Sequence, residues 1–198
     1  MSNILPNRHS IRLCGYDYSQ SGLYFVTICA QNRECLFGNI VGAIHESPLP
    51  KMVLNDIGKI IDSVFKTLPD RFPVILDAFQ IMPNHIHMII QINHFRTGLI
   101  HQTPNNIAIA KSNRHMGLIN QTPTLGHIIR NFKSKCTYKI HKNGFNNVIW
   151  QRNYYEHIIR TENDLNKIRE YVNINPLIWD RDRNNLESKQ KTDKNKLF

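Results

Sequence analysis

Two histidines that are one residue apart, His85 and His87, have a spacing that suits a metal-binding pair. They begin the apolar segment HIHMIIQI over 85–92, which is typical of a strand in the middle of a sheet. Side chains two residues apart in a strand point to the same face, about 6.5–7 Å apart along the backbone, so both imidazoles can converge on one divalent ion at about 2 Å each. The alternative is a chance pairing in a chain with ten histidines, although an unpaired imidazole in an apolar strand is costly. A His-x-His-x-His site of the nucleotide-hydrolase type is excluded because position 89 is isoleucine.

A tyrosine near the end of the chain is the second candidate for chemistry. Lys167, Tyr171 and Asn175 are spaced four residues apart and therefore share one face of a predicted helix over 162–175. The phenol oxygen of Tyr171 could attack a phosphodiester and form a covalent link, which splits one hard exchange into two easier steps. The amide oxygen of Asn175 could complete the ligand set of a metal and leave positions open for a scissile phosphate. Packing on the core is the alternative role for Tyr171.

Two adjacent tyrosines, Tyr154 and Tyr155, compete with Tyr171 as nucleophiles. They follow Trp150 within a predicted strand over 148–160. This position favours stacking on nucleobases or packing in the core over nucleophilic attack.

Hydrophobic periodicity predicts the elements that must position these residues. In the strand of the histidine pair, Ile86, Met88 and Ile90 are expected on the other face, buried against a helix. The last helix is expected to stop before Pro176, because a proline disfavours helical geometry in the residue before it. Strands are predicted over 23–30, 74–82, 85–92 and 148–160, helices over 54–68, 125–141 and 162–175, and a loop where Gly38, Gly42, Pro48 and Pro50 occur. The order β-α-β-β-α-β-α predicts an α+β fold, an antiparallel sheet of ferredoxin-like topology with helices packed on it.

The domain organisation is expected to be simple. A chain of 198 residues suits one domain, which we place over residues 1–180. Residues 93–124 are rich in Asn, Thr, Gly and Pro and contain a near-repeat, GLIHQTP and GLINQTP, so they are predicted to form an inserted, mobile loop. Residues 181–198 are charged and nearly free of apolar side chains, which predicts a basic, disordered tail.

The charge of the chain favours a polyanionic partner. Lys and Arg number 25 against 15 Asp and Glu, a net charge of +10 with neutral histidine. The last 18 residues contribute only +3 of this (six Lys and Arg minus three acids), so the body keeps +7. Basic surfaces bind nucleic acid by releasing the counterions condensed on its phosphates.

The sequence favours a cytoplasmic protein with reduced thiols. No apolar run is long enough to span a membrane, and no secretory signal begins the chain. The four cysteines show no spacing typical of a metal site or of disulfides.

These motifs together resemble the REP-associated tyrosine transposases, a branch of the single-tyrosine HUH transposases, where HUH denotes His-hydrophobic-His. The resemblance covers roughly residues 8–180. It rests on four segments, YFVTIC from Tyr24, MPNHIHMI from Met82, WQRNYYEHIIR from Trp150 and YVNINP from Tyr171. One departure is the 93–124 segment, which is longer than expected for the family's core.

The resemblance implies a role for each candidate residue. His85 and His87 would bind Mg²⁺ or Mn²⁺, and Asn175 would be the third protein ligand, in the place where other single-tyrosine transposases have glutamine. Tyr171 would form a 5′-phosphotyrosine with single-stranded DNA and release a 3′-hydroxyl. The partner would be hairpin-forming repetitive extragenic palindromes, and the enzyme would be a monomer or homodimer associated with the nucleoid, on an HUH sheet.

Two alternatives remain at this point. A catalytically silent regulator that binds palindromes could keep the same residues. A relaxase or replication initiator with an HUH sheet would place its tyrosine before the histidines, whereas Tyr171 comes 84 positions after His87 (171 minus 87), which disfavours this class.

Overall fold

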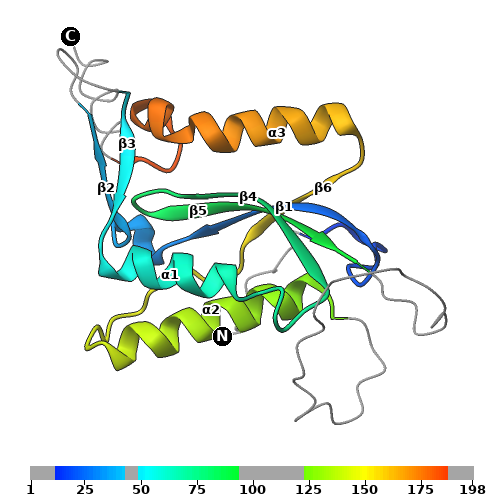
Figure 1. The fold of residues 1–198 in the computed structure, drawn as a ribbon, viewed down its shortest axis with the longest axis horizontal. Coiled ribbons are helices and arrows are strands. Elements are labelled where there is room, and N and C mark those ends of the chain that lie inside the picture. Colours follow the sequence, from blue (N-terminus) through cyan, green and yellow to red (C-terminus); the bar gives the residue numbers. More distant parts are fainter. Residues whose placement is uncertain (1–11, 43–48, 94–122, 187–198) are drawn as a thin grey trace, which may run out of the picture.

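A four-stranded antiparallel sheet forms the centre of the molecule in the computed structural model, which describes residues 12–42, 49–93 and 123–186. The strands lie in the order β4 (Val74–Ile81), β5 (His85–Ile92), β1 (Gly22–Cys29) and β6 (Tyr155–Ile159) (Figure 1). β1 is central because it pairs antiparallel with both β5 and β6 along an apolar, β-branched sequence. β4 and β5 form a hairpin that turns at Pro83 and Asn84. The predicted antiparallel α+β fold is confirmed.

Helices cover both faces of this sheet. α1 (Asp56–Lys66) and α2 (Leu125–Lys142) lie on one face, and α3 (Glu162–Ile174) lies on the other (Figure 1). Each helix begins at a polar residue whose side chain caps it by accepting a hydrogen bond from a backbone N–H of the first turn, and these caps are Asn55, Thr124 and Thr161. The larger core lies between the sheet and α1 and α2 and includes Ile86, Met88 and Ile90, which are fully buried as predicted. A smaller apolar cluster, Ile89, Ile159 and Leu165, joins α3 to the opposite face.

A second, two-stranded sheet replaces the predicted loop after the first strand. β2 (Gly38–Val41) and β3 (Lys51–Leu54) form an antiparallel hairpin, so the loop prediction is wrong for these residues. Gly38 has a φ of +140°, and a Cβ there would lie 2.1 Å from the carbonyl oxygen of Val53, so only glycine fits. Gly58 allows α1 to pack against the same segment, because a Cβ there would lie 2.2 Å from the carbonyl oxygen of Phe37.

The chain after α3 is more ordered than the sequence predicted. α3 ends at Ile174, before Pro176 as predicted, and a 3-10 helix, η2 (Asn175–Arg181), continues from it. Asp182, Asn184 and Asn185 are then buried, at 6%, 3% and 5% exposure, so the predicted disordered tail is wrong for residues 181–186. Two of these side chains form hydrogen bonds with the backbone: Asp182 accepts from the N–H of Asn184, and Asn185 donates to the carbonyl oxygen of Trp179. A count of apolar residues does not detect polar segments that are buried in this way. The remainder of that tail, and the predicted insertion apart from its ends, lie outside the described residues.

A smaller difference concerns the bounds of the last strand. The predicted strand over 148–160 is shorter, with β6 over 155–159 and an isolated bridge between Ala30 and Trp150. Among the helices of the described ranges, none combines the length and the apolar character needed to cross a membrane.

Candidate metal and nucleophile site

The histidine pair lies at the start of β5 on the face of the sheet that α3 covers. His85 is fully buried and His87 is 2% exposed. Their Nε2 atoms are 3.0 Å apart, so both rings point to one spot as the strand alternation predicts. Two ligand atoms this close can bind one divalent ion at about 2.1 Å each.

Hydrogen bonds fix the orientation of both rings. Asn84 donates from Nδ2 to the carbonyl oxygens of Arg33 and Asn184, at 3.0 and 2.8 Å, which leaves its Oδ1 to face His85 Nδ1 at 2.9 Å. An amide oxygen only accepts, so His85 Nδ1 donates and its Nε2 keeps a lone pair. His87 Nδ1 lies 2.9 Å from the Thr27 hydroxyl, which accepts in the same way when Nδ1 is protonated. Such partners on the far nitrogen orient histidines that bind metals.

The surroundings keep both imidazoles neutral. Burial, reinforced by the guanidinium groups of Arg33 and Arg183, lowers the pKa of His85 to about 3. Burial and the neighbouring His85 hold the pKa of His87 well below its usual value. Neutral imidazole is the form that binds metals, so the pair is ready for a metal at neutral pH.

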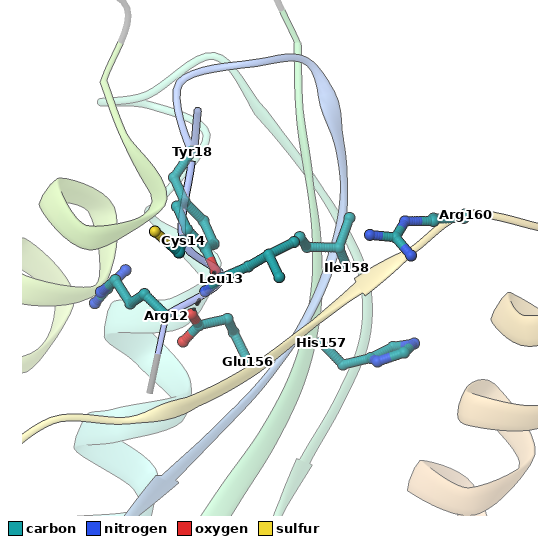
Figure 2. Close-up of a pocket in the computed structure, with 8 residues that line it drawn as sticks. All are labelled: Arg12, Leu13, Cys14, Tyr18, Glu156, His157, Ile158 and Arg160. Atoms are coloured by element: carbon teal, nitrogen blue, oxygen red, sulfur yellow. Dashed lines mark hydrogen bonds between the residues drawn. The ribbon is translucent and has the colours of Figure 1, made fainter. Parts of the chain in front are cut away.

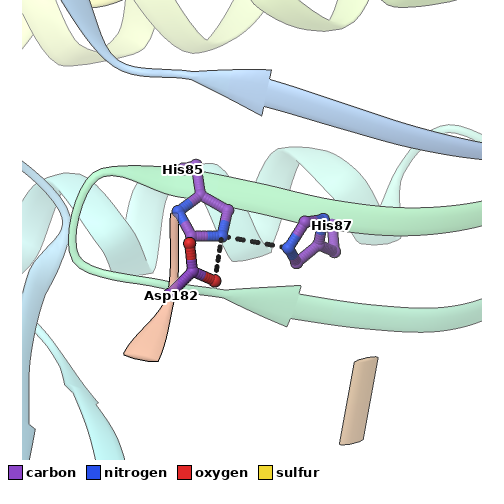
Figure 3. A group of neighbouring side chains, drawn as sticks. All are labelled: His85, His87 and Asp182. Carbon is purple, nitrogen blue, oxygen red and sulfur yellow. Dashed lines mark hydrogen bonds and ion pairs between the residues drawn. The ribbon is translucent and has the colours of Figure 1, made fainter. Parts of the chain in front are cut away.

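A carboxylate that the sequence did not predict completes a cluster with the pair. Asp182 Oδ2 lies 3.8 Å from His85 Nε2, and one ligand atom from each of the three side chains lies within 4.8 Å of the others (Figure 3). Asp182 Oδ1 accepts a hydrogen bond of 2.6 Å from the backbone N–H of Asn184, which fixes the carboxylate in a turn. The sequence DRNN signals such a turn, but nothing in it places the turn beside the histidines.

Tyr171 projects from α3 toward the same spot. Its hydroxyl lies 3.5 Å from His87 Nε2, and its ring packs edge-on against Phe25 and His87, with centroids 6.2 and 5.3 Å away. Burial raises the pKa of the Tyr171 phenol, and the Asp182 carboxylate raises it further, while the Asn175 amide and the Arg183 guanidinium oppose the shift. The phenol is therefore protonated at neutral pH.

Asn175 lies beside Tyr171 although it belongs to η2. Its backbone keeps helical angles, φ −54° and ψ −41°, so the four-residue spacing still places both side chains on one side. The residue is fully buried, and neither atom of its amide makes a hydrogen bond with any described residue. Each buried amide group that lacks a hydrogen bond lowers the stability of the fold by roughly 1–3 kcal/mol. The amide oxygen of Asn175 is therefore available to bind a cation. Lys167, the third residue of the predicted face, is exposed.

The two competing tyrosines do not contact the histidine pair. Tyr154 is buried in the core on the α2 side, and burial raises its pKa to about 12. Tyr155 is 48% exposed and pairs with Thr27 of β1, so it lies two strands from β5, at roughly 10 Å. Among the described tyrosines, Tyr171 is the one whose hydroxyl approaches His87.

A polar pocket at the β6 edge of the sheet contains none of the candidate residues (Figure 2). There the Tyr18 hydroxyl donates a hydrogen bond of 2.8 Å to Glu156, while His157 projects to the other side of β6 and contacts Asp164 at 2.8 Å. The pocket is lined by Arg12, Leu13, Cys14, Tyr18, Glu156, His157, Ile158 and Arg160. The pocket does not extend the histidine site.

Two known proteins are similar in sequence to most of this chain. The chain is 39% identical over 179 residues to a Haemophilus influenzae protein without an assigned function, covering 90% of this chain and 93% of that protein. It is 28% identical over 161 residues to another H. influenzae protein, described as a REP-associated tyrosine transposase, covering 81% of this chain and 73% of the relative. No family model matches the chain.

A solved structure of a REP-associated tyrosine transposase bound to a REP hairpin has the same fold. The TM-score is 0.51 at 17% identity, and the likeness covers 84% of this chain and 73% of the solved one. The chain is therefore similar in sequence to a REP-associated tyrosine transposase and shares its fold with a solved structure of one.

Proposed function

We propose that this protein is a REP-associated tyrosine transposase, which cleaves and rejoins single-stranded hairpin DNA through a covalent bond to Tyr171, with a divalent metal at the histidine pair. The observation that supports this most strongly is the 3.5 Å approach of the Tyr171 hydroxyl to His87 Nε2. A nucleophile and a metal site that lie this close can act on one phosphate.

The chemistry is a pair of transesterifications. The Tyr171 oxygen attacks phosphorus, the bond to the 3′ oxygen breaks, and the phenol proton is lost as the 3′ oxygen gains one. A 3′-hydroxyl on another strand then attacks the phosphotyrosine and releases Tyr171 by the reverse proton exchange. Neither step consumes water or an energy-supplying cofactor, because each step exchanges one phosphodiester for another.

The side chains present fit a divalent metal. His85 and His87 would offer Nε2, the amide oxygen of Asn175 its unpartnered lone pairs, and Asp182 a carboxylate oxygen. Mixed nitrogen and oxygen donors suit Mn²⁺ and are compatible with Mg²⁺. When bound, the metal would polarise the scissile phosphate and stabilise developing negative charge.

Two arginines supply positive charge around the same spot. Arg33 has a left-handed backbone, φ 56°, and its carbonyl is held by Asn84, the residue that orients His85. A non-glycine residue in this conformation requires support, and such positions cluster at functional sites. The Arg33 guanidinium donates to the carbonyl oxygen of Arg183 at 3.2 Å, which brings the two residues together beside His85. We infer that they attract the phosphate backbone.

The test uses a pool of hairpin oligonucleotides with randomised single-stranded flanks. With Mn²⁺, the wild type should yield a protein–DNA band that survives denaturing gel electrophoresis, and Tyr171→Phe should yield none. Tyr155→Phe is the matched control, because it removes an exposed phenol from the same sheet face and should leave the band unchanged. Adduct formation by Tyr171→Phe at the wild-type level would refute the proposed nucleophile. DNA binding without any adduct would favour the silent regulator.

A further inference from the structure

A pocket lies directly beside the histidine site, between the β2–β3 hairpin and η2. Asn39, Ile40, Gly42 and Pro50 form the wall from the hairpin, and Pro176, Leu177, Trp179 and Asp180 form the wall from η2, with Cys35, Pro83 and Asn185 completing the lining. In Figure 1 the hairpin stands next to the end of α3, where η2 begins. The cavity volume is about 420 Å³, enough for one nucleotide.

The pocket shares its walls with the proposed catalytic residues. Pro83 precedes Asn84 and His85 by one and two residues, and Pro176 directly follows Asn175. The Trp179 indole lies near the His85 ring, with centroids 6.0 Å apart and planes tilted by 30°. The Trp179 carbonyl accepts hydrogen bonds from the Asp182 backbone, at 3.0 Å, and from Asn185 Nδ2, at 3.1 Å. The indole and the Asp182 carboxylate are therefore held in one rigid turn.

The lining has the chemistry that a nucleobase needs. Trp179, Leu177 and the prolines offer flat or apolar surface, and aromatic side chains stack on bases whatever their sequence. Asn39 is exposed on β2 and brings an amide with both donor and acceptor groups, the combination that can pair with a base edge. A charged or purely aliphatic ligand would match this lining less well.

We propose that this pocket binds an unpaired base of the DNA flank, one nucleotide from the phosphate that Tyr171 attacks. The proposal rests on the proposed function for its choice of ligand, because the pocket opens beside the atoms that would act on that phosphate. Binding the base against Trp179 would fix the position of the phosphate along the strand. The β2–β3 hairpin of the protein therefore takes part in substrate recognition, because it forms one wall of the pocket.

The first experiment measures stacking without catalysis. The chain has two tryptophans, and Trp150 is 8% exposed in the core against Phe37 and Phe132. In Trp150→Phe the remaining fluorescence comes from Trp179, and a hairpin selected from the pool by binding, in EDTA, should quench it. In Trp179→Phe the remaining tryptophan is buried in the core, and the same DNA should leave its emission unchanged. Equal quenching in both variants would overturn the proposal.

The second experiment locates the base. Abasic sites are placed one at a time along the single-stranded flank, and affinity is measured for the wild type and Trp179→Ala. An abasic site at one position should weaken binding to the wild type by roughly 5- to 150-fold, the range for losing one base–aromatic stack. The same abasic site should not weaken binding to Trp179→Ala any further, because that variant has already lost the stack. Equal losses in both proteins at every position would refute a base bound at Trp179. This comparison does not depend on the folding of Trp150→Phe.

The outcomes separate this proposal from the proposed function. If Tyr171 forms no adduct but quenching and the abasic position persist, the pocket is a base-binding site of a non-catalytic protein. If adducts form normally and both pocket experiments fail, another part of the protein determines where the DNA is cleaved, and the base-binding proposal is wrong.

Discussion

The two faces of β5 have opposite characters within eight residues. On the α2 side, Ile86, Met88 and Ile90 are fully buried in a continuous apolar core. On the α3 side, His85 and His87 alternate with them and face Thr27, Asn84 and Asp182 through polar contacts. Strand alternation thus lets one segment anchor the fold with one set of side chains and position the histidine pair with the other. Substitutions on the two faces should therefore damage different properties.

The largest effect is expected from the polar face. His85→Ala removes a proposed metal ligand and should weaken Mn²⁺ binding more than about 100-fold, since even outer-shell changes cost roughly 10–100-fold. Adduct formation should be lost with it. Calorimetric titration with Mn²⁺ and the denaturing gel measure the two effects, and circular dichroism should show a folded protein. Full Mn²⁺ affinity in this variant would contradict the proposal that the polar face of β5 binds the metal.

The neighbouring apolar face should show the reverse. Met88→Ala leaves a cavity in the core and should lower the free energy of unfolding by about 2–5 kcal/mol, as measured by urea denaturation. Mn²⁺ affinity and adduct yield per folded molecule should stay at the wild-type level. A loss of Mn²⁺ affinity in the folded fraction would show that the two faces are coupled.

A smaller effect is expected where α3 is clamped to the edge of the sheet. Arg169 donates two hydrogen bonds to Asp77 of β4, at 2.9 and 2.5 Å, and these lower the pKa of the Asp77 carboxyl. A lowered folded-state pKa stabilises the fold above the unfolded value, about 3.9, and this contribution disappears as the pH falls through the folded-state pKa. Asp77→Asn should therefore be less stable than the wild type at pH 7, and urea denaturation should show the difference shrinking below about pH 4. A difference that is constant from about pH 7 to about pH 3 would contradict this ion pair's role.

The sequence predicted the residues whose positions follow from local periodicity. His85 and His87 share a face because they are two apart in a strand, and Tyr171 and Asn175 because they are four apart in a helix. Asp182 could not be predicted, because its place depends on a polar turn that folds back onto the start of β5. The β2–β3 hairpin was missed because its strands have only four residues each, and the glycines and prolines in and between them are typical of a loop. Local sequence patterns thus predicted the two histidines, the tyrosine and the asparagine of the site. The position of Asp182 depends instead on contacts between segments that are far apart in the chain.

The most direct test of Tyr171 as the nucleophile is to identify the residue that is covalently bound to the DNA. The adduct formed by the wild type is digested with trypsin and nuclease, and the peptide that retains a nucleotide is sequenced by mass spectrometry. We expect the modification on the peptide over 170–181, at Tyr171. A nucleotide on the peptide over 153–160, which contains Tyr154 and Tyr155, would contradict it.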